Sequence, residues 1–382
     1  MDEIRLSAST AADGLSPSAS AAISSAHQKL SKRRRRPLLV LLVVALVAAG
    51  GAAWTWVVVP VLAPAYKTTF LIDAAEGDLA SVTEALTTVV GNSGSRDSQS
   101  LRSFGGECGS DDNTTQLVGF GTGNREEIAA AARSVRQGAK ATLQRGIVEA
   151  VDDFTPWYSL KAKQVNRIIV VTRHGKDACD SDDEFVQKQI RDRVAAAGLT
   201  IEFRFIGYRT PDHEPLKKLT TQLQTQEPAF ADSPEDLRKW LDWFTTVEPV
   251  LRSAQSVVNA LNPTVDKLNA ATDAVRSGRF DLADAALTEA RDAVVDVEIK
   301  DLDGRTASVE AVDVRDKAIS LRRLQEEVIK AADVLAREAR SGRNLAEPLA
   351  VYTKAAKAYN DEAALMTERL TQLRGKGLGG TR

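Results

Sequence analysis

The chain has 382 residues, of which 43% are hydrophobic, 27% charged and 5% aromatic, and its formal net charge at pH 7 is -2. At about 150 residues per domain, this length predicts two or three domains. The composition excludes a collagen-like chain, a wholly disordered chain and a disulfide-dense miniprotein. The near-zero net charge, with a pI of about 6.1, argues against a dedicated nucleic-acid-binding protein, which would carry a strong basic excess.

The N-terminal part predicts a tail and one membrane span. Residues 1–36 are rich in Ser and Ala and lack aromatic residues, so we interpret them as a disordered cytoplasmic tail. The uncharged run 37–65 has an apolar core from Leu38 to Val59, and about 20 apolar residues cross a bilayer as a helix. Five basic residues, 32–36, precede it and the first charge after it is Lys67, which places the N-terminus in the cytoplasm and the remainder outside. The alternative is a cleaved signal peptide.

The cysteine content agrees with an outside location. Cys108 and Cys179 both follow the predicted span, and an even pair in an oxidising compartment is most simply a disulfide. Closing this loop would stabilise the fold by roughly 4 kcal/mol in the chain-entropy model. A metal site is disfavoured because neither residue belongs to a Cys-x-x-Cys pair.

Residues 66–246 alternate short apolar runs with amphipathic segments. The runs predict strands over 68–73, 100–104, 115–120, 167–172 and 200–206, and the segments predict helices over 79–90, 126–135, 143–154 and 184–197. This alternation is typical of an α/β doubly wound, mostly parallel sheet with helices on both faces. Such sheets bind ligands beyond the carboxyl ends of their strands, here at Asp73, after Thr172 and in the loop 103–113.

An ordered set of segments in this region resembles a known family. The set consists of 69–73 (Thr-Phe-Leu-Ile-Asp), 104–108 (Phe-Gly-Gly-Glu-Cys), 117–124, 168–172 followed by 175–179, and 229–240. In this order they are similar to a bacterial von Willebrand factor type A domain. The resemblance implies that family's fold and a metal-ion-dependent adhesion site. That site needs Asp-x-Ser-x-Ser after the first strand, a Thr two loops later and an Asp after the fourth strand.

The sequence departs from that metal-site pattern. The matching positions are Asp73, Ala75, Gly77, Ala141 (or Thr142, one residue later) and Arg173. Both serine hydroxyls are missing, and an arginine would repel a divalent cation, which needs several oxygen ligands. We therefore expect neither a metal nor a cofactor. We also expect the Arg173 guanidinium to take the cation's place and to pair with Asp73.

The sequence offers two other candidate sites, an acid–base set and a calcium site, and for each the alternative is a solvated polar loop. His174, Asp177 and Asp73 could form an acid–base set, but no Ser or Cys nucleophile with a matching neighbour is evident, so we expect no enzyme. The disulfide would also bring two acidic loops together, which could hold calcium, although their spacing matches no EF-hand loop. These loops contain Asp111, Asp112 and Asn113 on one side and Asp180, Asp182 and Asp183 on the other.

Beyond Thr246 the pattern becomes purely helical and predicts an all-α bundle over 247–373. The pair Asn262-Pro263 predicts a helix start, and Gly278 and Gly342 suit helix ends. Arg-Ser-Gly-Arg occurs at 276–279 and again at 340–343. Because a predicted helix follows each copy, we expect two helical hairpins. The Gly-rich residues 374–382 are predicted to be a flexible tail.

These features predict a single-pass protein of the cell membrane, with the bulk of the chain extracytoplasmic, that acts as a binding or scaffolding module of the cell envelope. Its expected partners are the lipid bilayer and an envelope protein or glycan, without nucleic acid, and the oligomeric state stays open. One alternative is a metal-dependent adhesin that uses the acidic loops. Another is a noncatalytic regulator of an envelope enzyme or transporter.

Overall fold

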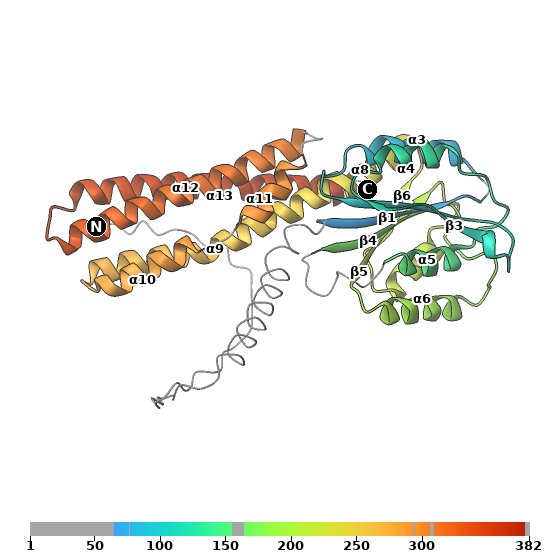
Figure 1. Ribbon diagram of the computed structural model, residues 1–382, viewed down its shortest axis with the longest axis horizontal. Coiled ribbons are helices and arrows are strands. Elements are labelled where there is room, and N and C mark those ends of the chain that lie inside the picture. The colour runs from blue at the N-terminus through green and yellow to red at the C-terminus, as the bar shows by residue number, and fades with distance from the viewer. Residues whose placement is uncertain (1–64, 76, 155–163, 293–294, 306–308, 379–382) are drawn as a thin grey trace, which may run out of the picture.

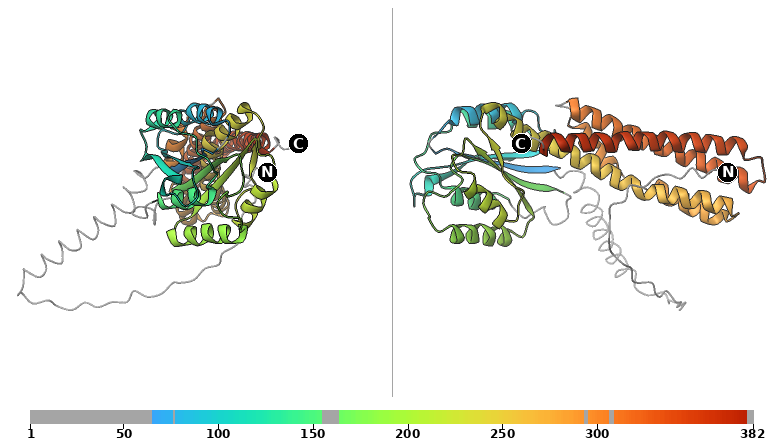
Figure 2. Two further views of the ribbon diagram at one scale, coloured as in Figure 1. Left: turned by 90° about the vertical axis from the view of Figure 1, so that its right-hand side faces the viewer. Right: turned by 180° about the vertical axis from the view of Figure 1, so that it is seen from behind.

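The computed structural model describes residues 65–75, 77–154, 164–292, 295–305 and 309–378. The predicted cytoplasmic tail and the apolar run Leu38 to Val59 lie outside these residues. Among the residues that are described, no helix is long and apolar enough to cross a membrane. Figures 1 and 2 show an α/β domain from which a long bundle of helices extends.

Six strands form one sheet in the order β3-β2-β1-β4-β5-β6. They are β1 (Tyr66–Asp73), β2 (Ser98–Phe104), β3 (Thr114–Gly121), β4 (Val165–Thr172), β5 (Ile201–Tyr208) and β6 (Ala229–Ala231). All pairs are parallel except β2 with β3, which is antiparallel. The five predicted strands are confirmed, with small differences at their ends. Strands β1 and β4 lie in the middle of the sheet, so almost all of their residues are buried on both faces, including polar ones such as Thr69 and Arg167.

Helices cover both faces of this sheet (Figure 1). Phe70 and Ile72 of β1 face a layer made of α3 (Leu79–Val90), α4 (Arg125–Arg133) and α8 (Pro234–Asp242). Leu71, between them in sequence, faces the opposite layer of α5 (Leu143–Asp152), α6 (Asp183–Ala197) and α7 (Glu214–Gln222). The predicted doubly wound α/β fold is confirmed, and this architecture fits that of a von Willebrand factor A-like domain.

The last helix of the α/β domain continues into the bundle. α8 leads through the π-helical turn η4 (Trp243–Val247) into α9 (Glu248–Arg276). The bundle also contains α10 (Phe280–Arg291), α11 (Asp296–Asp303), α12 (Val309–Arg340) and α13 (Ala346–Leu378). The predicted helix start at Asn262-Pro263 is wrong, since Pro263 lies inside α9. Leu261 and Val265 on either side of it are buried in the bundle core, and this packing holds the helix together despite the missing N–H. α13 also continues past Leu373 to Leu378, through part of the predicted flexible tail.

The two Arg-Ser-Gly-Arg copies adopt the same turn. Gly278 and Gly342 have φ values of +71° and +67°, the left-handed conformation that glycine adopts without steric cost. The arginine after each glycine donates its main-chain N–H to a carbonyl of the preceding helix, Arg279 to Ala274 at 2.8 Å and Arg343 to Glu338 at 3.1 Å. The predicted helix ends are therefore confirmed, and each turn closes a helical hairpin.

A buried arginine joins the two domains. Arg305, which follows α11, is 2% exposed and donates two hydrogen bonds to the Asp97 carboxylate before β2, at 2.8 and 2.7 Å. It also donates to Asp301 at 3.0 and 3.1 Å, and its guanidinium lies 4.8 Å from the centre of the Tyr66 ring. Burial alone would lower the pKa of Arg305, but the two carboxylates outweigh it and the pKa is raised. None of these contacts was predicted.

A second charged cluster ties the sheet to the first turns of α9. The buried Arg167 in β4 lies 3.5 Å from a Glu248 oxygen and 3.7 Å from a Glu202 oxygen. Arg204 in β5 donates to Glu248 at 3.2 Å, and Arg252 in α9 donates to Glu202 at 3.0 Å. The clusters of Arg305 and Arg167 both contact Tyr66 at the start of β1, so the joint lies at the end of the sheet opposite to Asp73.

Candidate functional site

The carboxyl ends of the parallel strands place the predicted site residues. Asp73 ends β1 and Thr172 ends β4, and the two strands pair through Ile72 and Val171 just before these ends. The prediction that Asp73 lies beside the loop after Thr172 is confirmed.

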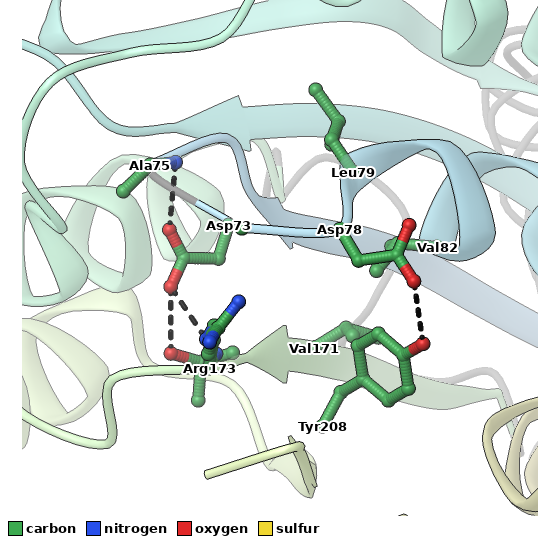
Figure 3. A pocket seen from close by; sticks show the side chains of 10 residues that line it. Asp73, Ala75, Asp78, Leu79, Val82, Val171, Arg173 and Tyr208 are labelled. Atoms are coloured by element: carbon green, nitrogen blue, oxygen red, sulfur yellow. Dashed lines mark hydrogen bonds between the residues drawn. The ribbon is translucent and has the colours of Figure 1, made fainter. Parts of the chain in front are cut away.

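Protein donors surround the Asp73 carboxylate (Figure 3). One oxygen accepts the Ala75 N–H at 3.0 Å. The other accepts the Thr172 hydroxyl at 2.9 Å and the Arg173 N–H at 3.3 Å, and the His174 Nδ1 atom lies 2.9 Å from it. The Asp73 side chain is 5% exposed. A carboxylate buried this deeply needs such partners, and here the main chain, a hydroxyl and an imidazole supply them.

The expected pairing of the Arg173 guanidinium with Asp73 is wrong. Arg173 approaches Asp73 through its main-chain N–H, so its side chain leaves in another direction and is exposed. It lies over Gly77, where an added Cβ would come within 2.9 Å of the Arg173 Cδ and guanidinium atoms. Gly77 also has a φ of +148°, so two constraints favour glycine at this position. The next residue, His174, provides the side chain that contacts Asp73.

The other positions of the resembled metal site do not converge on Asp73 as oxygen ligands. Ala75 contributes its N–H, and Ala141 is buried and accepts the Ala178 N–H at 2.8 Å through its main-chain oxygen. The Thr142 hydroxyl accepts the Gly105 N–H at 3.1 Å and donates to the Asn113 carbonyl at 2.8 Å. These residues do not fit a divalent cation, which needs several oxygen ligands. Across the described part of the chain, no group of three or more His, Cys, Asp or Glu residues is placed to hold a metal.

The disulfide between Cys108 and Cys179 is confirmed, with a Cα–Cα distance of 5.4 Å. It ties the loop after β2 to the loop after β4. The carboxylates of the second loop bind main-chain N–H groups: Asp177 accepts from Gln144 at 2.7 Å and from Cys179 at 2.8 Å, and Asp182 caps α6. Asp177 is thus turned to α5, and the imagined acid–base set of His174, Asp177 and Asp73 keeps only the contact between His174 and Asp73.

A second carboxylate at this edge was missed by sequence reasoning. Asp78 caps α3 by accepting the Ser81 N–H at 3.2 Å, and it also accepts the Tyr208 hydroxyl at 3.0 Å and the Arg209 guanidinium at 2.9 Å. The Ser81 hydroxyl is the main group that holds the pKa of Asp78 below its usual range. Asp78, Tyr208 and Asp73 line one small pocket. The spacing Asp-x-x-Ser before a helix could have indicated the cap, but not the contact with β5.

This edge of the sheet presents arginine and lysine side chains to solvent. Arg173 and Lys176 in the loop after β4 are exposed, and so is Arg209 after the neighbouring β5. The arrangement can therefore recognise a partner through exposed hydrogen-bond donors, while the carboxylates below them are already bound by the protein.

No family model matches the sequence, and no curated protein matches it. Solved structures with a similar fold include the pilus adhesin SpaC from Lactobacillus rhamnosus GG, at 11% identity over 47% of this chain and 30% of that chain, with a TM-score of 0.38. A von Willebrand factor type A protein from Catenulispora acidiphila is 14% identical over 47% of this chain and 42% of that chain, with a TM-score of 0.37. The vWF domain of the pili tip protein Mfa5 from Porphyromonas gingivalis is 10% identical over 48% of this chain and 94% of that chain, with a TM-score of 0.35. The chain thus spans less than half the length of the first two solved chains that it matches.

Proposed function

We propose that this chain is a membrane-anchored, extracytoplasmic and noncatalytic binding protein. Its α/β domain recognises a partner without a metal ion, and its helical bundle acts as a scaffold beside that domain. The observation that carries the proposal is the Asp73 carboxylate, whose two oxygens already accept or contact four protein groups. Because these groups already satisfy the Asp73 carboxylate, it does not require a cation. The exposed arginine and lysine side chains near it can bind a partner without a metal ion.

Two further observations support the proposed location. The uncharged run 37–65 directly precedes β1, with basic residues on its N-terminal side. The disulfide between Cys108 and Cys179 suits an oxidising compartment. Protease added to spheroplasts should therefore degrade the α/β domain and the bundle, whereas full protection of residues after Lys67 would contradict this orientation.

Metal independence is tested on the full chain purified in detergent. Calorimetric titration with Mg²⁺, Mn²⁺ or Ca²⁺ should give no heat of specific binding. The midpoint of thermal unfolding should be the same in EDTA as in the presence of each cation. Stoichiometric binding of a cation that is lost in the Asp73→Ala variant would overturn the proposal.

Partner binding is tested by affinity capture from native membranes in EDTA. The double variant Arg173→Ala/Lys176→Ala should lose the captured partner, because it removes two of the exposed basic side chains at the strand ends. The matched control Arg323→Ala/Lys330→Ala removes two exposed basic residues from α12 and should retain the partner. Recovery that needs Mg²⁺, or equal loss in both variants, would count against recognition at this face.

A further inference from the structure

A groove runs along α8 to the place where the bundle meets the α/β domain. Its volume is about 270 Å³. Four elements contribute to it: the end of β6, one face of the continuous helix α8–η4, and the ends of α12 and α13. Its lining includes Phe230, Asp232, Trp240, Asp242, Trp243 and Glu310. This groove is separate from the Asp73 pocket, with which it shares no lining residue.

The aromatic wall of the groove is fixed by its surroundings. The Trp240 indole N–H donates to the Phe230 carbonyl at 3.1 Å, and the Trp240 ring stacks on Phe244 with 5.9 Å between ring centres. Phe230 in turn stacks on His213 at 3.7 Å. Trp243 packs against the cores of both domains and is half-buried. These partly exposed indole rings are therefore held in place before any ligand arrives, which lowers the entropic cost of binding.

The polar lining of the groove is strongly acidic. Asp232, Asp236, Asp242 and Glu310 contribute carboxylates, and Lys239 contributes an ammonium group. Neither Asp232 nor Asp242 forms an ion pair with any side chain that the structure describes. Indole faces attract a cation placed over them, and a carboxylate beside an arginine or lysine forms a charge-assisted hydrogen bond. Both features of the lining thus favour the same kind of ligand.

We propose that this groove binds an arginine or lysine side chain from a basic, extended segment of a partner protein. The cationic group lies against Trp240 and Trp243 and pairs with Asp232 and Asp242. A neutral glycan would stack on the indoles but leave the carboxylates without a counter-charge, so charge complementarity favours the basic peptide. This inference goes beyond the proposed function and does not depend on recognition at the strand ends.

The test uses the full chain in detergent and fluorescence anisotropy of a labelled tetra-arginine peptide, with a labelled tetra-glutamate peptide as the comparison. We expect the tetra-arginine peptide alone to bind, with an affinity that falls as NaCl is raised. Asp232→Asn/Asp242→Asn should weaken binding at least tenfold. The matched control Asp292→Asn/Glu347→Gln neutralises two exposed carboxylates elsewhere in the bundle and should change the affinity less than twofold. Asp232→Lys, at an exposed position, provides a second variant if the double variant unfolds.

Several results would overturn the proposal. Equal weakening by the groove variant and the control would mean that the peptide binds acidic surface in general. If neutral cellohexaose displaces the peptide and the groove variant leaves the peptide affinity unchanged, the groove is a glycan site and its carboxylates do not bind the peptide. Binding that arises only after removal of residues 379–382 would mean that the chain's own terminus, with Arg382, occupies the groove.

Discussion

Replacing Arg305 with methionine should destabilise the protein more than any change at the strand-end site. The Arg305 side chain is 1% exposed, and its partners Asp97 and Asp301 are 6% and 9% exposed. The substitution therefore leaves two buried carboxylates, one in each domain, without the guanidinium that they share. Methionine preserves much of the side-chain volume, so the effect reports on charge and hydrogen bonding.

The burial decides the expected magnitude. An exposed ion pair contributes about 0–1 kcal/mol, whereas removal of one partner from a buried pair costs about 3–5 kcal/mol. Because Arg305 serves two carboxylates, we expect the upper half of that range, which lowers the thermal midpoint by on the order of 10 °C. Asp97→Asn retains the contact between Arg305 and Asp301 and should cost less, about 1–3 kcal/mol.

Thermal unfolding of the full chain in detergent provides the assay. The wild type should unfold in one main transition, and Arg305→Met should separate the α/β domain from the bundle as two transitions. The control Arg323→Met breaks an exposed pair with Glu327, in which the arginine side chain is 66% exposed, and should cost under about 1 kcal/mol. A loss for Arg305→Met no larger than that of the control would refute the reasoning.

Three further predictions concern other parts of the chain. Arg173→Ala should cost under about 1 kcal/mol and Asp73→Ala about 1–3 kcal/mol in chemical denaturation, since only Asp73 is buried among hydrogen bonds, and the reverse order would contradict the geometry described. Burial raises the pKa of Tyr66 to about 12 from an unfolded value near 10, so its contribution is complete below about pH 10 and is lost as the pH rises toward 12, by about 3 kcal/mol. Tyr66→Phe should abolish that part of the alkaline loss of stability. The same fall in unfolding midpoint between pH 9 and pH 11.5 in the wild type and in the variant would argue against it. Cys108→Ser/Cys179→Ser should lower the free energy of unfolding by about 4 kcal/mol, and free thiols at both positions in protein from the envelope would rule out the bond as a source of stability.

Sequence patterns predicted the elements whose signal is local. The runs at 68–73 and 167–172 form β1 and β4, whose side chains are buried on both faces of the sheet, and parallel pairing brings Asp73 beside the end of β4. Spacing could not predict which of the consecutive residues Thr172, Arg173 and His174 would direct a side chain to Asp73. That choice depends on the backbone direction at the strand end, where Arg173 offers its N–H instead.

Contacts between distant segments left no local signal. Asp97 and Arg305 are separated by 208 positions, and each resembles an ordinary solvated charge when its own neighbours are considered. Pro263 lies inside α9 for a related reason, because tertiary packing outweighs the local preference of proline for a helix start. The aromatic and acidic groove also combines residues from four elements, β6, the continuous helix α8–η4, α12 and α13, and hydrophobic periodicity predicts each of these elements separately.

The π-helical turn at 243–247 sets the angle between the two faces of one helix. The Glu248 N–H donates to the Trp243 carbonyl, which is the i to i+5 pattern with one more residue in the turn than an α-helix has. Before the turn, Leu237 and Leu241 face the sheet, and after it Val250 and Ala254 face the bundle core. Each residue of an α-helix corresponds to about 100° of rotation. Deleting one residue here would therefore rotate α9 and the rest of the bundle by about that angle relative to the sheet. Glu248 would then lie away from Arg204, and the bundle would no longer pack against the α/β domain in the same orientation.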